Sequence, residues 1–241
     1  MNSEEKTVVI VPTYNERENL PNLVEHLDRL PVRVDLLVVD DNSPDGTGQV
    51  AEKLKKTHPW IHVLHRKNKS GLGSAYVAGF KWAIERDYNF IMEMDGDLSH
   101  DPKDIPKFIE AAKGSDLVLG SRYTNGIRVI NWPLKRLILS LSAAQYVKII
   151  TGMPFQDPTG GYKLFRREAL RSIDLDRIRS NGYSFQIELT HILWRNKFQI
   201  EEVPIIFTDR YHGTSKMSKE IVREALLIVW QLLFENRFKR S

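Results

Sequence analysis

The chain of 241 residues has 41% apolar and 27% charged residues, the composition of an ordinary globular protein. Its net charge of +4 is too small to indicate nucleic acid as a partner, and without cysteine it can form neither disulfides nor thiolate metal sites. No apolar run reaches the roughly 18 residues that span a bilayer, and no signal peptide precedes the first strand. We therefore expect a protein that is soluble or lies on a surface.

The first hundred residues alternate between short apolar runs and helical patterns. Strands are predicted at residues 8–11, 36–39, 61–65 and 90–94. Helices are predicted between them, one opened by the capping pair Asn15 and Glu18, one over residues 47–57, and one after Gly71. This alternation implies right-handed crossovers, and therefore an α/β, Rossmann-like fold with a mostly parallel central sheet.

The pattern changes after residue 100, where strands and helices no longer alternate strictly. Helices are predicted over residues 102–112, 134–150, 167–172, 185–194 and 218–238. Further strands are predicted at residues 117–120, 162–165 and 200–207. A polar, glycine-containing segment at 211–216 is a candidate lid over a site.

Polar clusters follow three of the first four strands, at Tyr14-Asn15-Glu16, Asp40-Asp41 and Asp95-Gly96-Asp97. Because ligands bind beyond the carboxyl ends of parallel strands, we expect these clusters to share a site. Two carboxylates separated by one glycine suit Mg²⁺ or Mn²⁺ held jointly with a phosphate. Solvated turn acids are the alternative, because Asp174-Leu175-Asp176 has the same spacing.

Residues 117–156 contain no Asp or Glu but carry five basic residues, so this region is predicted to face anions. Within it, residues 134–150 form a basic amphipathic pattern that suits either a core helix with a cationic face or a helix at a membrane interface. In the interfacial reading, the apolar face would consist of Trp132, Leu137, Leu141 and Ile150.

Several common site motifs are missing from the sequence. No Gly-x-Gly-x-x-Gly follows the first strand, and neither a Walker loop nor a Gly-x-Ser-x-Gly elbow occurs. The histidines, His100 among them, lack zinc-protease spacing and are interpreted as surface or turn residues.

The motifs together resemble those of the polyprenyl-phosphate (dolichyl-phosphate) mannosyltransferases, which are inverting, metal-dependent glycosyltransferases with an A-type fold. The matching segments are residues 11–19, 39–47, 71–76, 94–100, 120–123, 157–161 and 210–217. The resemblance implies a nucleotide pocket formed by Pro12, Tyr14, Glu16, Val39 and Asp41. It further implies that Asp95, Gly96 and Asp97 hold metal and diphosphate, that Arg122 and Arg136 bind the acceptor phosphate, and that Arg210 and Lys216 grip the diphosphate.

The resemblance implies one catalytic domain over residues 1–241, with a nucleotide-sugar half (1–100), an acceptor half (101–209), a mobile loop (210–217) and a C-terminal amphipathic helix (218–241). The implied reaction moves mannose from GDP-mannose to a polyprenyl or dolichyl phosphate, with Mg²⁺ or Mn²⁺, at the cytoplasmic face of a membrane. A membrane-anchoring partner subunit is compatible with it. The alternatives are another nucleotide sugar such as UDP-glucose, a soluble acceptor, or a non-catalytic membrane adaptor.

Overall fold

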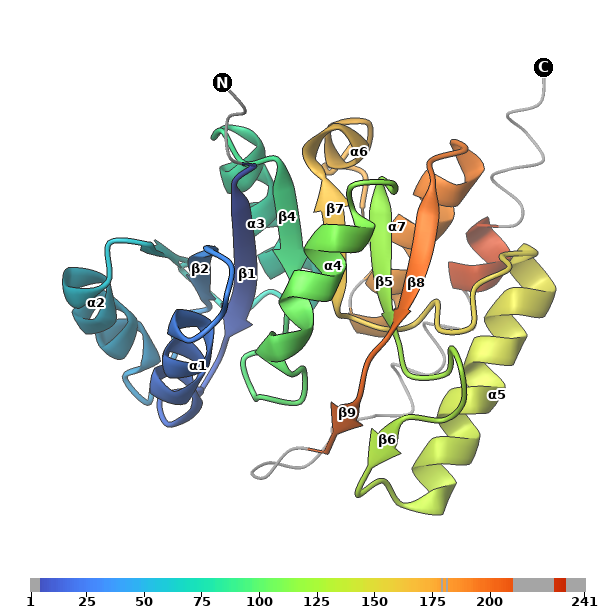
Figure 1. Ribbon diagram of the computed structural model, residues 1–241, viewed down its shortest axis with the longest axis horizontal. Coiled ribbons are helices and arrows are strands. Elements are labelled where there is room, and N and C mark those ends of the chain that lie inside the picture. The colour runs from blue at the N-terminus through green and yellow to red at the C-terminus, as the bar shows by residue number, and fades with distance from the viewer. Residues whose placement is uncertain (1–4, 179, 181, 210–227, 233–241) are drawn as a thin grey trace.

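The computed structural model describes residues 5–178, 180, 182–209 and 228–232. Figure 1 shows a central sheet with helices on both of its faces. The sheet has seven strands in the order β3-β2-β1-β4-β7-β5-β8. Its strands are β1 (Thr7–Thr13), β2 (Asp35–Asp40), β3 (Ile61–His65), β4 (Phe90–Glu93), β5 (Leu117–Ser121), β7 (Lys163–Arg166) and β8 (Ile200–Pro204). A parallel pair, β6 (Val129–Ile130) and β9 (Phe207–Thr208), lies apart from it.

Among the described strands of this sheet, β7 alone runs antiparallel, between β4 and β5. The remaining pairs are parallel, so those strands end at the same edge of the sheet. This arrangement confirms the predicted Rossmann-like α/β fold with a mostly parallel sheet.

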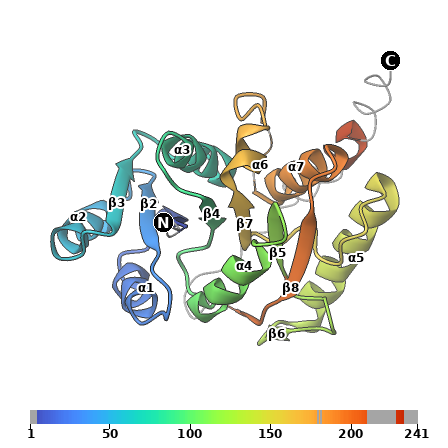
Figure 2. The ribbon, with the colours of Figure 1, turned by 45° about the horizontal axis from the view of Figure 1, so that its top comes forward.

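Two layers of helices cover the sheet, as Figure 2 shows most clearly. The helices are α1 (Asn19–Asp28), α2 (Thr47–Thr57), α3 (Leu72–Ile84), α4 (Ile105–Ala111), α5 (Leu134–Thr151), α6 (Arg167–Arg171) and α7 (Gly182–Arg195), with a 3-10 turn at Pro102–Asp104. Alternate side chains of β1 face opposite layers: Val8 and Ile10 pack with α3 and α7, whereas Val9 and Val11 pack with α1 and α4. Burial of both faces explains why β1 and β2 are continuous apolar runs.

Two local predictions are wrong. The α1 helix begins at Asn19, and the side chain of its N-cap residue Glu18 makes no capping hydrogen bond. Asn15 has a left-handed φ of 65° and its backbone N–H donates to Ser43 Oγ, so Asn15 belongs to the preceding turn. The strand predicted over 200–207 is divided into β8 and β9, because the chain changes pairing partner after Pro204 from β5 to β6.

The C-terminal part of the chain is described for residues 228–232, which are helical. Val229 and Leu232 are buried there and pack on the α3/α7 core. The predicted mobile loop 210–217 and most of the predicted helix 218–241 lie outside the described residues. None of the helices that the structure describes has both the length and the hydrophobicity needed to cross a bilayer.

Candidate active site

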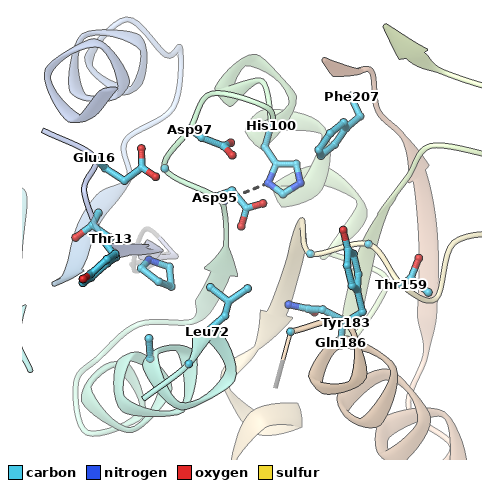
Figure 3. Close-up of a pocket in the computed structure, with 18 of the residues that line it drawn as sticks. Thr13, Glu16, Leu72, Asp95, Asp97, His100, Thr159, Tyr183, Gln186 and Phe207 are labelled. Carbon is cyan, nitrogen blue, oxygen red and sulfur yellow. Dashed lines mark hydrogen bonds between the residues drawn. The ribbon is translucent and has the colours of Figure 1, made fainter. Parts of the chain in front are cut away.

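A pocket of about 350 Å³ lies at the carboxyl edge of the sheet. Figure 3 shows Thr13 and Glu16 on one side of it, Thr159 and Phe207 on the other, and Asp95 between them. The predicted site residues that line it are Pro12, Tyr14, Glu16, Asp41, Asp95, Gly96, Asp97, Arg122 and Arg136. The three strand-end clusters and the two arginines therefore share one cavity.

One predicted site residue does not line this cavity, and two others cannot be located in the part of the chain that the structure describes. The side chain of Val39 is fully buried and packs on the core between β2 and α3, so Val39 does not line the pocket. Arg210 and Lys216 lie outside the described residues.

The acidic turn after β4 is held by its own side chains. The backbone N–H of Asp95 donates to His100 Nδ1 at 3.1 Å, and the backbone N–H of Ser99 donates to Asp97 Oδ1 at 3.0 Å. Leu98 between them has a left-handed φ of 62°, which folds the turn back on itself. A β-carbon at Gly96 would lie 3.1 Å from Val11 Cγ1, so glycine lets the turn pack closely against β1.

The donor set of this turn fits a hard divalent cation. Among the described residues no group of three His, Cys, Asp or Glu side chains could enclose a metal by itself. Mg²⁺ typically takes one or two carboxylates and completes its shell with water and substrate phosphates. Asp95 and Asp97, both lining an open pocket, match a metal bound jointly with a diphosphate.

The far side of β1 offers an aromatic face and a carboxylate. The Tyr14 ring is 37% exposed, and the Lys69 ammonium lies 3.7 Å from its centroid. Asp41 accepts a 2.6 Å hydrogen bond from Arg66 Nη1, and Arg66 Nη2 donates to Ser74 at 2.8 Å. Burial raises the pKa of Asp41, and Arg66 opposes that rise. A flat ring beside a fixed carboxylate suits a planar heterocycle that carries N–H donors.

The opposite side of the pocket contains a buried ion pair. Arg122 donates through Nε and Nη2 to the two oxygens of Asp157, each at 2.6 Å, and Nη2 also donates to Thr159 at 3.0 Å. Burial alone raises the pKa of Asp157, but the Arg122 guanidinium outweighs it and holds that pKa below its usual range. Asp157 is therefore a carboxylate already occupied by Arg122, which makes it a poor general base.

The second arginine, Arg136 on α5, is also held in place. Its Nη1 donates to Asp209 Oδ1 at 2.6 Å, and its guanidinium lies 4.1 Å from the Trp132 ring centroid. Both arginines thus present planar cationic groups to the pocket from fixed positions, an arrangement that suits a phosphate.

The sequence interpretation missed several pocket residues, among them the buried side chains of His100 and Gln186. His100 is 3% exposed and stacks on Tyr162 at 4.6 Å between centroids, so it is not a surface residue. Its place in the matching segment 94–100 was the one available signal. Gln186 lies inside a helical pattern that gave no sign of its contact with the pocket. Lys69, Thr159 and Tyr183 also line the cavity.

A family model described as "Glycosyl transferase family 2" matches residues 8–174, which include the acidic turn and the Arg122–Asp157 pair. The chain belongs to glycosyltransferase family 2. It is therefore a glycosyltransferase, and the alternative of a non-catalytic adaptor is set aside.

Curated relatives agree with the resemblance drawn from the motifs. The chain is 46% identical over 239 residues to the polyprenol monophosphomannose synthase of Mycolicibacterium smegmatis, covering 98% of this chain and 90% of that one. It is 46% identical over 224 residues to the undecaprenyl-phosphate mannosyltransferase of Micrococcus luteus, covering 93% and 92%. The dolichol-phosphate mannosyltransferase of Pyrococcus furiosus is 38% identical over 236 residues, and the match covers 95% of this chain but 64% of that protein.

Among solved structures, a glucosyl-3-phosphoglycerate synthase from Mycobacterium tuberculosis, in complex with Mn²⁺, UDP and glucosyl-3-phosphoglycerate, superposes with a TM-score of 0.68 at 18% identity. The match covers 95% of this glycosyltransferase and 79% of that chain. At this identity the likeness shows the A-type fold and nothing about substrates.

The acidic turn generates a first prediction. Asp97→Ala should lower the rate of glycosyl transfer about a thousandfold or more, because a lost metal ligand removes several kcal/mol of transition-state stabilisation. Thermal unfolding should change only by the loss of the hydrogen bond from the Ser99 N–H, about 1–3 kcal/mol, since Asp97 lines the pocket and not the apolar core. The measurement is initial rate at saturating metal, with Mn²⁺-dependent nucleotide binding as a second readout.

Asp176→Ala is the matched control, since Asp176 has the same Asp-x-Asp spacing. Its side chain is 81% exposed and pairs with Lys81, and exposed pairs of this kind contribute about 0–1 kcal/mol. Asp176→Ala should be nearly silent. Equal losses in the two variants would show that the metal site is assigned to the wrong acids.

Proposed function

We propose that this glycosyltransferase transfers mannose from GDP-mannose to a polyprenyl or dolichyl phosphate, with inversion, using Mg²⁺ or Mn²⁺. The observation that carries the proposal is the single pocket that joins the acidic turn of Asp95 and Asp97 to Arg122 and Arg136. Such a pocket offers one place for a metal-bound diphosphate and another for an acceptor phosphate. The names of the relatives at 38–46% identity support the same donor sugar and the same class of acceptor.

The donor would occupy the side of the pocket formed by β1, β2 and β4. Its base would lie against Tyr14 with Asp41 as hydrogen-bond acceptor, and its diphosphate would reach the acidic turn. Asp95 and Asp97 would hold the metal, which when bound stabilises the charge that develops on the leaving diphosphate. Arg210 and Lys216, which lie outside the described residues, are proposed to add positive charge at the same diphosphate.

The acceptor phosphate would attack from the side of Arg122 and Arg136. A phosphate monoester has its second pKa near ~6, so at neutral pH it is mostly a dianion and needs no general base. Its oxygen forms the new bond to the anomeric carbon as the bond to the diphosphate oxygen breaks, and the electron pair leaves with the nucleotide. The occupied carboxylate of Asp157 is consistent with a reaction that requires no proton acceptor.

The arginines retain capacity for a phosphate although both are paired with acids. A guanidinium carries five N–H donors, and the bonds of Arg122 to Asp157 and Thr159 use three of them. Asp157 would therefore orient the Arg122 guanidinium, and Asp209 the Arg136 guanidinium, before the acceptor binds.

The membrane-facing surface is proposed to be the outer face of α5, at the right of Figure 1. Its most exposed apolar side chains are Leu134 (69%), Ile138 (55%), Leu139 (41%) and Ile149 (77%). This face differs from the one expected from sequence: Leu137, Leu141 and Ile150 are partly buried, and Ile150 packs on the core. An apolar face with Lys135 and no acids suits the boundary of an anionic leaflet, where a polyprenyl chain would be anchored. We propose that the enzyme binds at the cytoplasmic face of the membrane.

The assay that tests the proposed function offers GDP-mannose and UDP-glucose in parallel to a short polyprenyl phosphate in the presence of Mg²⁺ or Mn²⁺. Mannose transfer from GDP-mannose, inhibited by GDP more strongly than by UDP, is the expected result. Transfer from UDP-glucose alone would show that the donor is UDP-glucose and not GDP-mannose. Transfer to a soluble acceptor, with none to the lipid, would show that the acceptor is not a polyprenyl phosphate.

The arginine pair generates a second prediction. Arg122→Lys and Arg136→Lys keep the charge but lose the planar fork, so each should raise the KM for lipid phosphate about tenfold while GDP affinity stays near normal. Arg177→Lys is the control, because the Arg177 side chain is 80% exposed. Weaker GDP binding with unchanged acceptor kinetics would move these arginines to the donor site.

The α5 face generates a third prediction. The protein should bind anionic liposomes at low salt, and Lys135→Glu should weaken that binding, since each basic residue near such a surface contributes about 1 kcal/mol. Replacing Ile138 and Ile149 together by serine should reduce it further. Lys56→Glu on α2, at the opposite end of the sheet, is the charge-matched control.

Activity separates direct docking from an anchoring subunit. The α5 variants should lose activity on long-chain lipid phosphate more than on a short soluble analogue. Protein that ignores anionic liposomes at low salt, yet turns over the soluble analogue, would contradict direct membrane docking and favour an anchoring partner.

A further inference from the structure

A buried side chain amide faces the pocket from α7. Gln186 is 3% exposed, and among the described residues neither its Oε1 nor its Nε2 has a hydrogen-bond partner. Figure 3 shows its amide end directed into the cavity, below Asp95. Buried polar groups in folded proteins are almost always paired, so an amide left open at the wall of a pocket points to a ligand.

The backbone of Gln186 is fixed although its amide is open. The Lys163 ammonium, fully buried on β7, donates to the Gln186 carbonyl oxygen at 2.7 Å and to Thr190 Oγ1 at 2.9 Å. Thr190 Oγ1 donates to the same carbonyl oxygen at 2.9 Å. This anchoring positions the side chain without using either amide atom.

The space beside the amide is also kept open. A β-carbon at Gly161 would lie 3.6 Å from Gln186 Nε2, so glycine there leaves the wall of the pocket clear. On the other side the amide lies beside Glu93, where burial raises the pKa of the Glu93 carboxyl to about 8 and the neighbouring Lys163 and Gln186 oppose that rise. The amide thus borders the pocket and is held from behind, with its own oxygen and nitrogen buried.

The place of Gln186 between the two charged ends decides what it meets. In a displacement with inversion, the transferred sugar lies between the leaving diphosphate and the attacking phosphate. Asp95 in the acidic turn marks the first end, and Thr159, which accepts a hydrogen bond from Arg122, marks the second. Figure 3 shows the Gln186 amide between Asp95 and Thr159. The sugar at this position carries hydroxyl groups, and each hydroxyl can both donate and accept a hydrogen bond. The Gln186 amide can also do both, since its nitrogen donates and its oxygen accepts. A phosphate, which only accepts, would leave Oε1 facing an anion.

We propose that Gln186 binds a hydroxyl group of the transferred hexose and contributes to the choice of donor sugar. The proposal rests on the proposed function, since it takes the pocket to hold a nucleotide sugar. It does not depend on which nucleotide the sugar carries.

The test combines Gln186→Met with donors that lack one hydroxyl each. Methionine keeps the length of the side chain and removes both polar atoms. The full-length enzyme and the variant are assayed with GDP-mannose and with its 2-, 3-, 4- and 6-deoxy forms, and GDP affinity is measured separately. Ser184→Ala is the matched control: Ser184 lies on the same helix, is 1% exposed and has an equally unpaired hydroxyl among the described residues, but it does not line the pocket.

The variant should lose about tenfold to a hundredfold in kcat/KM for GDP-mannose while its GDP affinity stays within about twofold of normal. One deoxy donor that is poor for the unmodified enzyme should suffer little further loss in the variant, because the lost hydroxyl and the lost amide are partners. Ser184→Ala should change none of these values.

Losses that are the same for every deoxy donor, or a fall in GDP affinity that matches the fall for GDP-mannose, would overturn the role of Gln186. Failure of the proposed function is seen separately, as an unmodified enzyme that transfers nothing from GDP-mannose. If it then uses UDP-glucose, the same comparison with deoxyglucose donors decides the role of Gln186.

Discussion

The shared direction of the parallel strands is the constraint on which the site depends. Strands β1, β2, β4 and β5 run the same way, so the polar residues that follow them are brought to one edge of the sheet. Tyr14, Asp41, the Asp95–Asp97 turn and Arg122 come from four separate segments, yet they line one pocket. Burial of both sheet faces leaves this edge as the place where polar chemistry can be displayed.

The antiparallel strand β7 divides this edge into two functional sides. It lies between β4, which delivers the acidic turn, and β5, which delivers Arg122. The insertion sets the acidic turn and Arg122 apart by one strand. It also places Lys163 opposite Glu93 beneath the pocket, where Lys163 anchors α7 through the Gln186 carbonyl.

Fixed charges distinguish the side of the pocket that carries the two arginines. Arg122 and Arg136 are each oriented by a carboxylate, Asp157 and Asp209, in bonds of 2.6 Å. Pre-oriented guanidiniums need little reorganisation when a phosphate arrives, which is the advantage of a prearranged electrostatic site. The same pairing removes Asp157 from proton transfer, so charge and geometry both suit a nucleophile that is already ionised.

The sequence by itself determined the class of fold, the position of the acidic turn and the family, because these features are local. Continuous apolar runs such as Val8–Val11 specify strands buried on both faces, and an acid pair directly after a strand must lie at its carboxyl end. The start of α1 and the break between β8 and β9 could not be predicted from local sequence, because each depends on hydrogen-bond partners elsewhere in the chain. Only the tertiary structure decided that Arg122 meets Asp157 across 35 residues, that Val39 faces the core, and that Gln186 faces the pocket. Periodicity specifies that a residue lies on a buried face, but the direction of β7 and the docking of α7 decide what that face touches.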